Sequence, residues 1–284
     1  MRYARLLVVA VLALGALGSP ARVRAHEGAL ETPGTPYPVI ARTTVYVFNG
    51  DRLDSRRWKV AYRAGAGKGT AQPEMQYYTP DAVTVDRGVL HLNALSLRQF
   101  DPADGFDYRY QSGRIESTES FLYGRFNVRL KVPIGNGLWP AVWLRTPESA
   151  GPINGQIDIF DGFGSHTDGF TASVDTWARG RLVARNCVIV ENYTAQTPCQ
   201  RIGNPQHARV NYARDYHTFG LDWQPDHLTW SVDGRPYWTV TKAIPNVPMV
   251  LVLDLAVGGA QDGPPPLHTR FPADFEIASI AITR

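Results

Sequence analysis

Short stretches in which apolar and polar residues alternate limit what this chain can fold into more than any other feature. In residues 125–133, RFNVRLKVP, every second side chain is apolar. Because successive side chains of a strand point to opposite faces, this spacing places Phe126, Val128 and Leu130 on one face and the residues between them on the other. A helix would need apolar residues three or four positions apart. The pattern therefore predicts strands and few helices.

Two pairs of such stretches are joined by residues that favour β-hairpins. The sequence AVTVDRGVLHLNAL turns at Asp86-Arg87-Gly88, and HLTWSVDGRPYWTV turns at Asp233-Gly234. A further stretch, MVLVLDLAVGG, is apolar almost throughout, which predicts a buried strand. Many short strands in one chain predict an all-β fold, with a two-sheet sandwich favoured over a barrel.

The first 25 residues have the pattern of a secretory signal peptide. Arg2 and Arg5 precede the apolar run Leu6–Leu17, and a small-residue cleavage site follows at Ala25. The run is shorter than the roughly 20 apolar residues of a membrane-spanning helix, and no other run of that length occurs. We therefore expect a secreted protein without a membrane span.

The rest of the chain is expected to form one domain. Residues 26–44 are a Pro- and Thr-rich lead, and no change of composition divides residues 45–284. The formal net charge of +3 includes four arginines within the first 25 residues, where no acidic residue occurs, so the remainder carries −1. The basic pI is thus no argument for nucleic-acid binding, and we expect a monomer.

The chain has two cysteines, Cys187 and Cys199. Two cysteines are too few for a cysteine-ligated metal centre, so no metal is expected. In an exported protein, a disulfide between them is favoured over two free thiols. Closing a loop of this size stabilises a protein by about 3 kcal/mol in the chain-entropy model.

Two neighbouring stretches combine tryptophan with polar residues. Trp139 and Trp143 are four positions apart, so on a strand they share a face. Core packing is the usual role of such residues, but Pro140 between them cannot donate to a sheet ladder. A short connection leads to NGQIDIFDGFG, where one amide and two carboxylates interrupt an apolar strand. Tryptophans beside acidic groups suit sugar rings, whose C–H faces stack on indole while their hydroxyls need polar partners.

YGRFNVRLKVPIGNGLWPAVWL, followed by GQIDIFDGFG, resembles glycoside hydrolase family 16, the β-glucanases and their relatives. The likeness extends from about Phe48 to the C-terminus and includes PEMQYYTPDAVTVDRGVLHLNA, SGRIES and YHTFGLDWQPDHLTWSVDGRPYWTV. The resemblance implies a jelly-roll β-sandwich related to concanavalin and the legume lectins. It also implies a polysaccharide groove across a concave sheet, with β-1,3- and β-1,4-linked glucans and galactans as the main substrates.

The catalytic strand of this family reads Glu-x-Asp-x-x-Glu. The first Glu is the nucleophile, the Asp assists it and the last Glu is the acid/base; this chain has Gln156, Asp158 and Asp161 at these positions. On a regular strand the third group would point away from the other two, so an extra residue near Ile159-Phe160 must return it to the groove. Asp175 stands where many relatives carry a histidine, and we expect it in the groove.

These substitutions have chemical consequences. A retaining glycosidase needs two carboxyl groups about 5–5.5 Å apart, one of which attacks the sugar. The amide of Gln156 is a poor nucleophile. The carboxyl of Asp161 is withdrawn by one methylene, and a misplacement of about 1 Å can cost about 10²-fold in rate. Ordinary double-displacement hydrolysis is therefore not expected.

Three functions remain open. The favoured one is a protein that binds a polysaccharide or oligosaccharide without cutting it. The second is an active glycosidase, glucanase-like or transglycosylating, with altered chemistry through Asp158 and Asp161. This includes inversion, which predicts a second carboxyl roughly 6.5–9.5 Å from Asp161, and substrate assistance by a 2-acetamido group. The third is a structural envelope protein, which predicts a groove that is filled or closed by the insertion FDPADGFDYRYQ.

The family resemblance also has implications for four positions outside the catalytic strand. Many relatives hold a structural calcium partly through an Asp in the last strand, where this chain has Ala278, so no cofactor is expected. Asp254 replaces a frequent Asn, which leaves a further groove carboxylate as an open alternative. Glu116 and His217 are interpreted as structural or groove-edge residues.

Overall fold

The computed structural model describes residues 41–66, 68, 73–151, 153–178, 180–190, 199–205 and 210–284. The predicted signal peptide and residues 26–40 of the lead lie outside these ranges. The first strand begins at Thr43, within the predicted lead. The predicted all-β fold is confirmed, because the one α-helix in the described part of the chain is a single turn, α1 (Gly259–Asp262).

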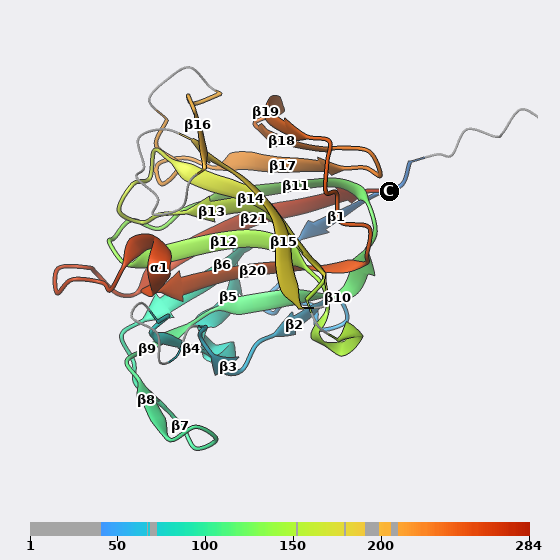
Figure 1. The fold of residues 1–284 in the computed structure, drawn as a ribbon. Coiled ribbons are helices and arrows are strands. Elements are labelled where there is room, and N and C mark those ends of the chain that lie inside the picture. Colours follow the sequence, from blue (N-terminus) through green and yellow to red (C-terminus); the bar gives the residue numbers. More distant parts are fainter. Residues whose placement is uncertain are drawn as a thin grey trace, which may run out of the picture. The chain divides into compact units, whose positions relative to one another are not determined.

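Residues 41–284 form two large sheets and one small one (Figure 1). Among the described residues, the back sheet has eleven strands: β1 (Thr43–Val47), β3 (Arg63–Ala64), β4 (Gln76–Tyr78), β5 (Val83–Asp86), β6 (Val89–Leu95), β9 (Tyr110–Ser112), β11 (Gly124–Lys131), β17 (His217–Trp223), β18 (Leu228–Val232), β19 (Arg235–Val240) and β21 (Ala273–Thr283). The groove sheet has eight: β2 (Trp58–Val60), β10 (Arg114–Phe121), β12 (Leu138–Arg145), β13 (Gly155–Gly162), β14 (Phe170–Ala178), β15 (Arg181–Val190), β16 (Gln200–Ile202) and β20 (Met249–Val257). The small sheet is β7 (Gln99–Asp101) with β8 (Phe106–Tyr108). Two 3-10 turns complete the elements, η1 (Pro80–Ala82) and η2 (Glu148–Ala150).

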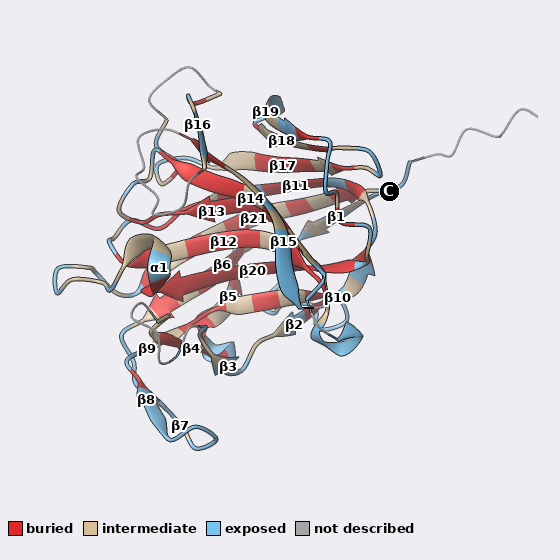
Figure 2. Cartoon of the chain, in the orientation of Figure 1, coloured by how far each residue is buried: buried red, intermediate tan, exposed pale blue. Residues whose placement is uncertain are grey.

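The alternating sequences place apolar side chains between the two large sheets. In β11 the residues 126, 128 and 130 are fully buried and those between them are exposed, as predicted. The nine residues of β20 are all buried, because this strand lies between β12 and β10 in the middle of the groove sheet (Figure 2). Both predicted hairpins form, and their turns, at Arg87-Gly88 and Asp233-Gly234, have the positive φ angles that tight two-residue turns require.

One buried tryptophan connects the two sheets directly behind the groove. Trp230 of β18 belongs to the back sheet and is fully buried. Its indole Nε1 donates a hydrogen bond of 3.0 Å to the backbone carbonyl of Asp158, in β13 of the groove sheet. The core therefore contacts the backbone of the strand that carries the predicted site.

The predicted disulfide is present at the edge of the groove sheet. Cys187 and Cys199 are bonded, with their Cα atoms 4.9 Å apart. They immediately precede Val188–Val190 of β15 and Gln200–Ile202 of β16, which pair in parallel. The bond thus aligns the outermost strand with its neighbour. In the described part of the chain, no helix has the length and apolar character needed to cross a membrane.

Candidate functional site

A pocket of about 360 Å³ opens on the groove sheet, on the face turned away from the core. Its lining includes five of the six residues that the sequence predicts for the groove, Gln156, Asp158, Asp161, Trp139 and Trp143, and lacks the sixth, Asp175. It also includes residues whose role was not predicted, namely Glu74, Tyr78 and Arg114. The predicted association of aromatic and acidic groups on one face is therefore found in the structure.

The predicted bulge brings Asp161 to the same face as Asp158. Along β12, Val142 pairs with Phe160 and Trp143 with Asp158, so Ile159 is an extra residue in β13. The register with β14 shifts at the same place. Both Ile159 and Phe160 point into the core, whereas the two carboxyl groups on either side of them line the pocket. An additional residue in one strand has this effect because it reverses the alternation beyond it.

Ala141 lies at the centre of the pocket floor. It pairs with Asp161 on one side and with Asp254 on the other, so these carboxylates stand two strands apart. At about 4.8 Å per strand, their Cα atoms are separated by about 10 Å. The tryptophans lie two residues before and after Ala141, and each donates to one carboxylate. Trp139 Nε1 is 3.3 Å from Asp161 Oδ1, and Trp143 Nε1 is 2.7 Å from Asp254 Oδ1.

Gln156 is hydrogen-bonded to its neighbour on the same face. Its Nε2 donates to Asp158 Oδ1 at 2.8 Å, and the hydroxyl of Ser173 donates to the other oxygen, Asp158 Oδ2. Both oxygens of Asp158 therefore accept from neutral donors. At position 156 the pocket therefore presents an amide and no carboxyl group.

Three carboxyl groups of the pocket have raised pKa values. Burial raises the pKa of Asp158 to about 6. Burial, and then the neighbouring charge of Asp158, raise the pKa of Asp161 well above its ordinary range. The pKa of Glu74 is raised by burial and by Asp254. None of the three forms an ion pair with a cation in the described part of the chain, so no direct opposite charge offsets the effect of burial on their pKa values.

Folding raises the pKa of Asp158. Replacing this residue with a neutral one should therefore change the stability of the protein by an amount that depends on pH. The folded-state pKa is about 6 and the ordinary value is 3.8, so the folded protein binds this proton more tightly than the unfolded chain does. The free energy of unfolding therefore falls as the pH rises from 3.8 through 6. Asp158→Asn should raise the free energy of unfolding by about 3 kcal/mol at pH 8 and have little effect at pH 4.

Urea denaturation at these two pH values measures this difference. Asp51→Asn, at an exposed position, is the matched control and should have no effect at either pH. A stabilisation of the same size at pH 4 and pH 8 would show that the gain does not come from the buried charge.

Asp175 pairs with Gln156 across the strands and therefore shares its face of the groove sheet. It is buried in β14, opposite Gln156, and does not line the pocket. Arg185 of β15 donates to it through both Nε, at 2.7 Å, and Nη2. Because both carboxylate oxygens are held by this guanidinium, Asp175 supports the wall beside the groove.

The residues that sequence analysis did not assign come from outside the two central strands. Glu74 lies in a connection and accepts from the backbone of Ala66 at 3.0 Å and from Gln76 Nε2 at 2.7 Å. The hydroxyl of Tyr78 donates to Asp254 Oδ2 at 2.7 Å, so the open alternative of a groove carboxylate at 254 is found. Arg114 of β10 lies over the rings of Trp143, at 5.1 Å, and Tyr78, at 5.7 Å.

The remaining predicted residues have structural partners. Glu116 is in an ion pair with Arg145, and His217 Nδ1 lies 2.8 Å from Asp233 Oδ2. Ala278 lies in β21. Among the described residues, no group of three or more His, Cys, Asp or Glu side chains is arranged to hold a metal ion.

Comparison with known proteins extends these observations. The family model for glycosyl hydrolases family 16 matches residues 72–269. The chain is similar to glucan endo-1,3-beta-glucosidase A1 of Niallia circulans, with 30% identity over 267 residues, 83% of this chain and 36% of that protein. It is also similar to the beta-1,3-glucan-binding protein of Penaeus monodon, with 30% identity over 173 residues, 51% of this chain and 45% of that protein. The matched regions thus span less than half the length of these relatives.

The fold has a close counterpart among solved structures. The laminarinase catalytic domain from Thermotoga maritima matches with a TM-score of 0.70 and 25% identity, over 85% of this chain and 96% of that chain. This likeness confirms the predicted jelly-roll sandwich. Since the family model covers well over half of the sequence and includes the pocket strands, the chain belongs to glycosyl hydrolase family 16.

Proposed function

We propose that this protein is exported and binds a β-linked glucan in the pocket of the groove sheet without hydrolysing it by double displacement. The observation that carries the proposal is Gln156, whose amide donates to Asp158 in the place of a nucleophile. An amide cannot form the glycosyl-enzyme bond that a retaining mechanism requires. The pocket nevertheless keeps two tryptophans beside hydrogen-bonding groups, the combination that sugar rings need.

The relatives support both halves of this proposal. One is named a glucan endo-1,3-beta-glucosidase and another a beta-1,3-glucan-binding protein. The names of proteins similar to this chain therefore include both glucan hydrolysis and glucan binding. Gln156, at the position of the attacking carboxylate, supports the proposal that this protein binds a glucan without cleaving it.

A purely structural role is less well supported. That hypothesis predicted a filled or covered groove, with the insertion at residues 100–111 as the cover. The insertion instead forms the β7–β8 hairpin, which projects away from the large sheets (Figure 1). No residue of it is among the described residues that line the pocket.

An inverting glycosidase is the second candidate, because Asp254 stands across Ala141 from Asp161. The backbone spacing of about 10 Å is compatible with the separation that an inverting pair of carboxyl groups needs. Asp161, protonated, would be the acid and Asp254 the base. Both oxygens of Asp254 already accept hydrogen bonds, from Trp143 and Tyr78, and this restricts their access to a water molecule. Reducing-end release by the wild type, abolished in Asp254→Asn, would establish this candidate over binding alone.

Binding should depend on the two tryptophans of the pocket. Trp139→Ala and Trp143→Ala should each weaken the binding of a β-1,3-linked oligosaccharide by about 10- to 30-fold, since each removes a stacking surface at the centre of the site. Isothermal titration calorimetry measures the change. Phe100→Ala removes an exposed aromatic ring from the projecting hairpin and should leave affinity unchanged. Equal affinities for all variants would place the glycan elsewhere.

A further inference from the structure

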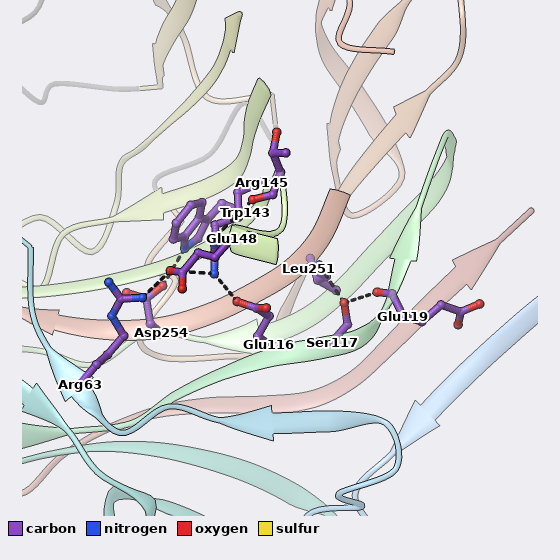
Figure 3. Close-up of polar contacts among 10 residues, drawn as sticks. Arg63, Glu116, Ser117, Glu119, Trp143, Arg145, Glu148, Leu251 and Asp254 are labelled. Carbon is purple, nitrogen blue, oxygen red and sulfur yellow. Dashed lines mark hydrogen bonds and ion pairs between the residues drawn. The ribbon is translucent and has the colours of Figure 1, made fainter. Parts of the chain in front are cut away.

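A row of alternating charges crosses the groove at one end of the pocket. It consists of Arg63, Glu148, Arg145 and Glu116, here called the charged bridge. Figure 3 shows Glu148 between Arg63 and Arg145, in front of Trp143. Glu148 Oε1 accepts from Arg63 Nη1 and lies 3.3 Å from Arg145 Nη2, which in turn is 2.5 Å from Glu116 Oε2.

The charged bridge joins opposite walls of the groove. Arg63 comes from β3, near the N-terminal side of the fold, and Glu148 comes from η2, in the connection between β12 and β13. Arg145 and Glu116 rise from the floor, from β12 and β10. The contact therefore depends on a strand of the back sheet, β3, and a connection of the groove sheet, η2, coming together.

A second pocket, also of about 360 Å³, lies on the other side of this row. Four residues line both pockets, namely Arg63, Arg114, Arg145 and Glu148. Three of them belong to the charged bridge. Beyond them the second pocket continues over β10 and β2, where Lys59 and Thr118 contribute to its lining. The charged bridge is thus a partition within what would otherwise be one longer groove.

The charged bridge is buried where it contacts the sheet and exposed where Arg63 meets Glu148. The side chains of Arg63 and Glu148 are 52% and 63% exposed, and an exposed ion pair of this kind contributes little to stability. Arg145, in contrast, is only 7% exposed and is paired with the half-buried Glu116. A glycan that passed through would have to displace Glu148 from both Arg63 and Arg145, whereas Arg145 and Glu116 would remain paired beneath it.

We propose that the charged bridge ends the glycan-binding groove, so that the protein binds the terminus of a glycan chain and not an internal segment. The inference rests on the proposed function of the pocket. A terminal sugar presents one more hydroxyl than an internal one, and the guanidinium and carboxylate groups of the bridge are hydrogen-bonding partners for it. Arg63 and Glu148 are then specificity-determining residues, because they keep the glycan from extending into the second pocket.

The number of binding sites per mass of glucan tests this proposal. Linear β-1,3- and β-1,4-glucans would be fractionated into short chains and chains about ten times longer, and the protein bound at saturation would be measured at equal glucan mass. The wild type should bind about tenfold less to the longer chains, because they have tenfold fewer termini. Arg63→Ala/Glu148→Ala should bind both fractions to within about twofold, because the joined pockets accept internal segments.

Controls separate this effect from unfolding and from failure of the proposed function. Asp54→Ala breaks an exposed Arg–Asp pair outside both pockets and should behave as the wild type does. Glu148→Gln keeps the size of the side chain and should shift binding towards internal segments in the same way as the double variant. If equal masses of short and long chains bound equal amounts of the wild type, the chain-end proposal would be overturned and the proposed function would stand. No binding of any variant to any fraction would overturn the proposed function as well.

Discussion

The double variant Gln156→Glu, Asp161→Glu should release reducing ends from a β-glucan, at a rate at least about 10²-fold above that of the wild type. The change at position 156 would restore a carboxylate that can attack the sugar, and the change at position 161 would extend the acid/base carboxyl by one methylene towards the glycosidic oxygen. The bulge at Ile159 already directs both positions into the pocket, so no change of backbone is needed. Reducing-end assays on β-1,3- and β-1,4-linked glucans measure the gain.

The two single variants are the controls for this experiment. Gln156→Glu restores the nucleophile beside a short acid and should recover only part of the rate. Asp161→Glu leaves the amide in place and should remain inactive. Rapid hydrolysis by the wild type, lost on Asp161→Asn, would contradict the binding proposal. An inactive double variant that still binds glucan would show that more than these two side chains separates this pocket from a catalytic one.

Of the substitutions considered, removal of the Trp230 side chain should have the largest effect on the free energy of unfolding. The indole is fully buried between the sheets, and Trp230→Ala should lower the free energy of unfolding by about 3–5 kcal/mol. Trp230→Phe retains most of the volume but loses the hydrogen bond to the carbonyl of Asp158, for a smaller loss of about 1–2 kcal/mol. Denaturant unfolding of the three proteins measures both values.

Trp238→Ala is the matched control, because this half-buried indole stacks on Trp230 with ring centroids 4.3 Å apart but does not contact β13 through its nitrogen. It should destabilise the protein less than Trp230→Ala does. Trp230→Phe should also weaken glycan binding several-fold, since the carbonyl next to the bulge loses its donor. Binding that is unchanged in a destabilised Trp230→Phe would mean that the bulge holds its geometry without this contact.

The elements that the sequence predicts well are those whose cause is local. The turns at Arg87-Gly88 and Asp233-Gly234 follow from residues that accept positive φ, and the faces of β11 follow from a two-residue period. The bulge at Ile159 could be predicted because without it the spacing of the polar residues would be inconsistent with a single groove face. In each case, neighbouring residues contain the necessary information.

The unpredicted parts of the site depend on contacts between distant segments. Glu74 belongs to an irregular connection, and its place opposite Gly258 arises from an isolated bridge rather than from a periodic pattern. The contact of Arg63 with Glu148 requires the short strand β3 to meet the connection between β12 and β13. Asp175 is paired with Gln156 across the strands, but its capture by Arg185 depends on the pairing register of β14 with β15. A single sequence contains no local sign of such encounters.

The disulfide at the rim of the groove sheet affects how separate molecules of this protein interact. With Cys187 and Cys199 bonded, the outer border of the sheet is the short strand β16, which exposes Gln200 and Arg201. Reduction would release β16 and uncover the backbone of Val188–Val190, an apolar strand edge able to pair with the same edge of another molecule. Reduction of the bond should therefore lower the solubility of the protein, which light scattering with and without a reducing agent would measure.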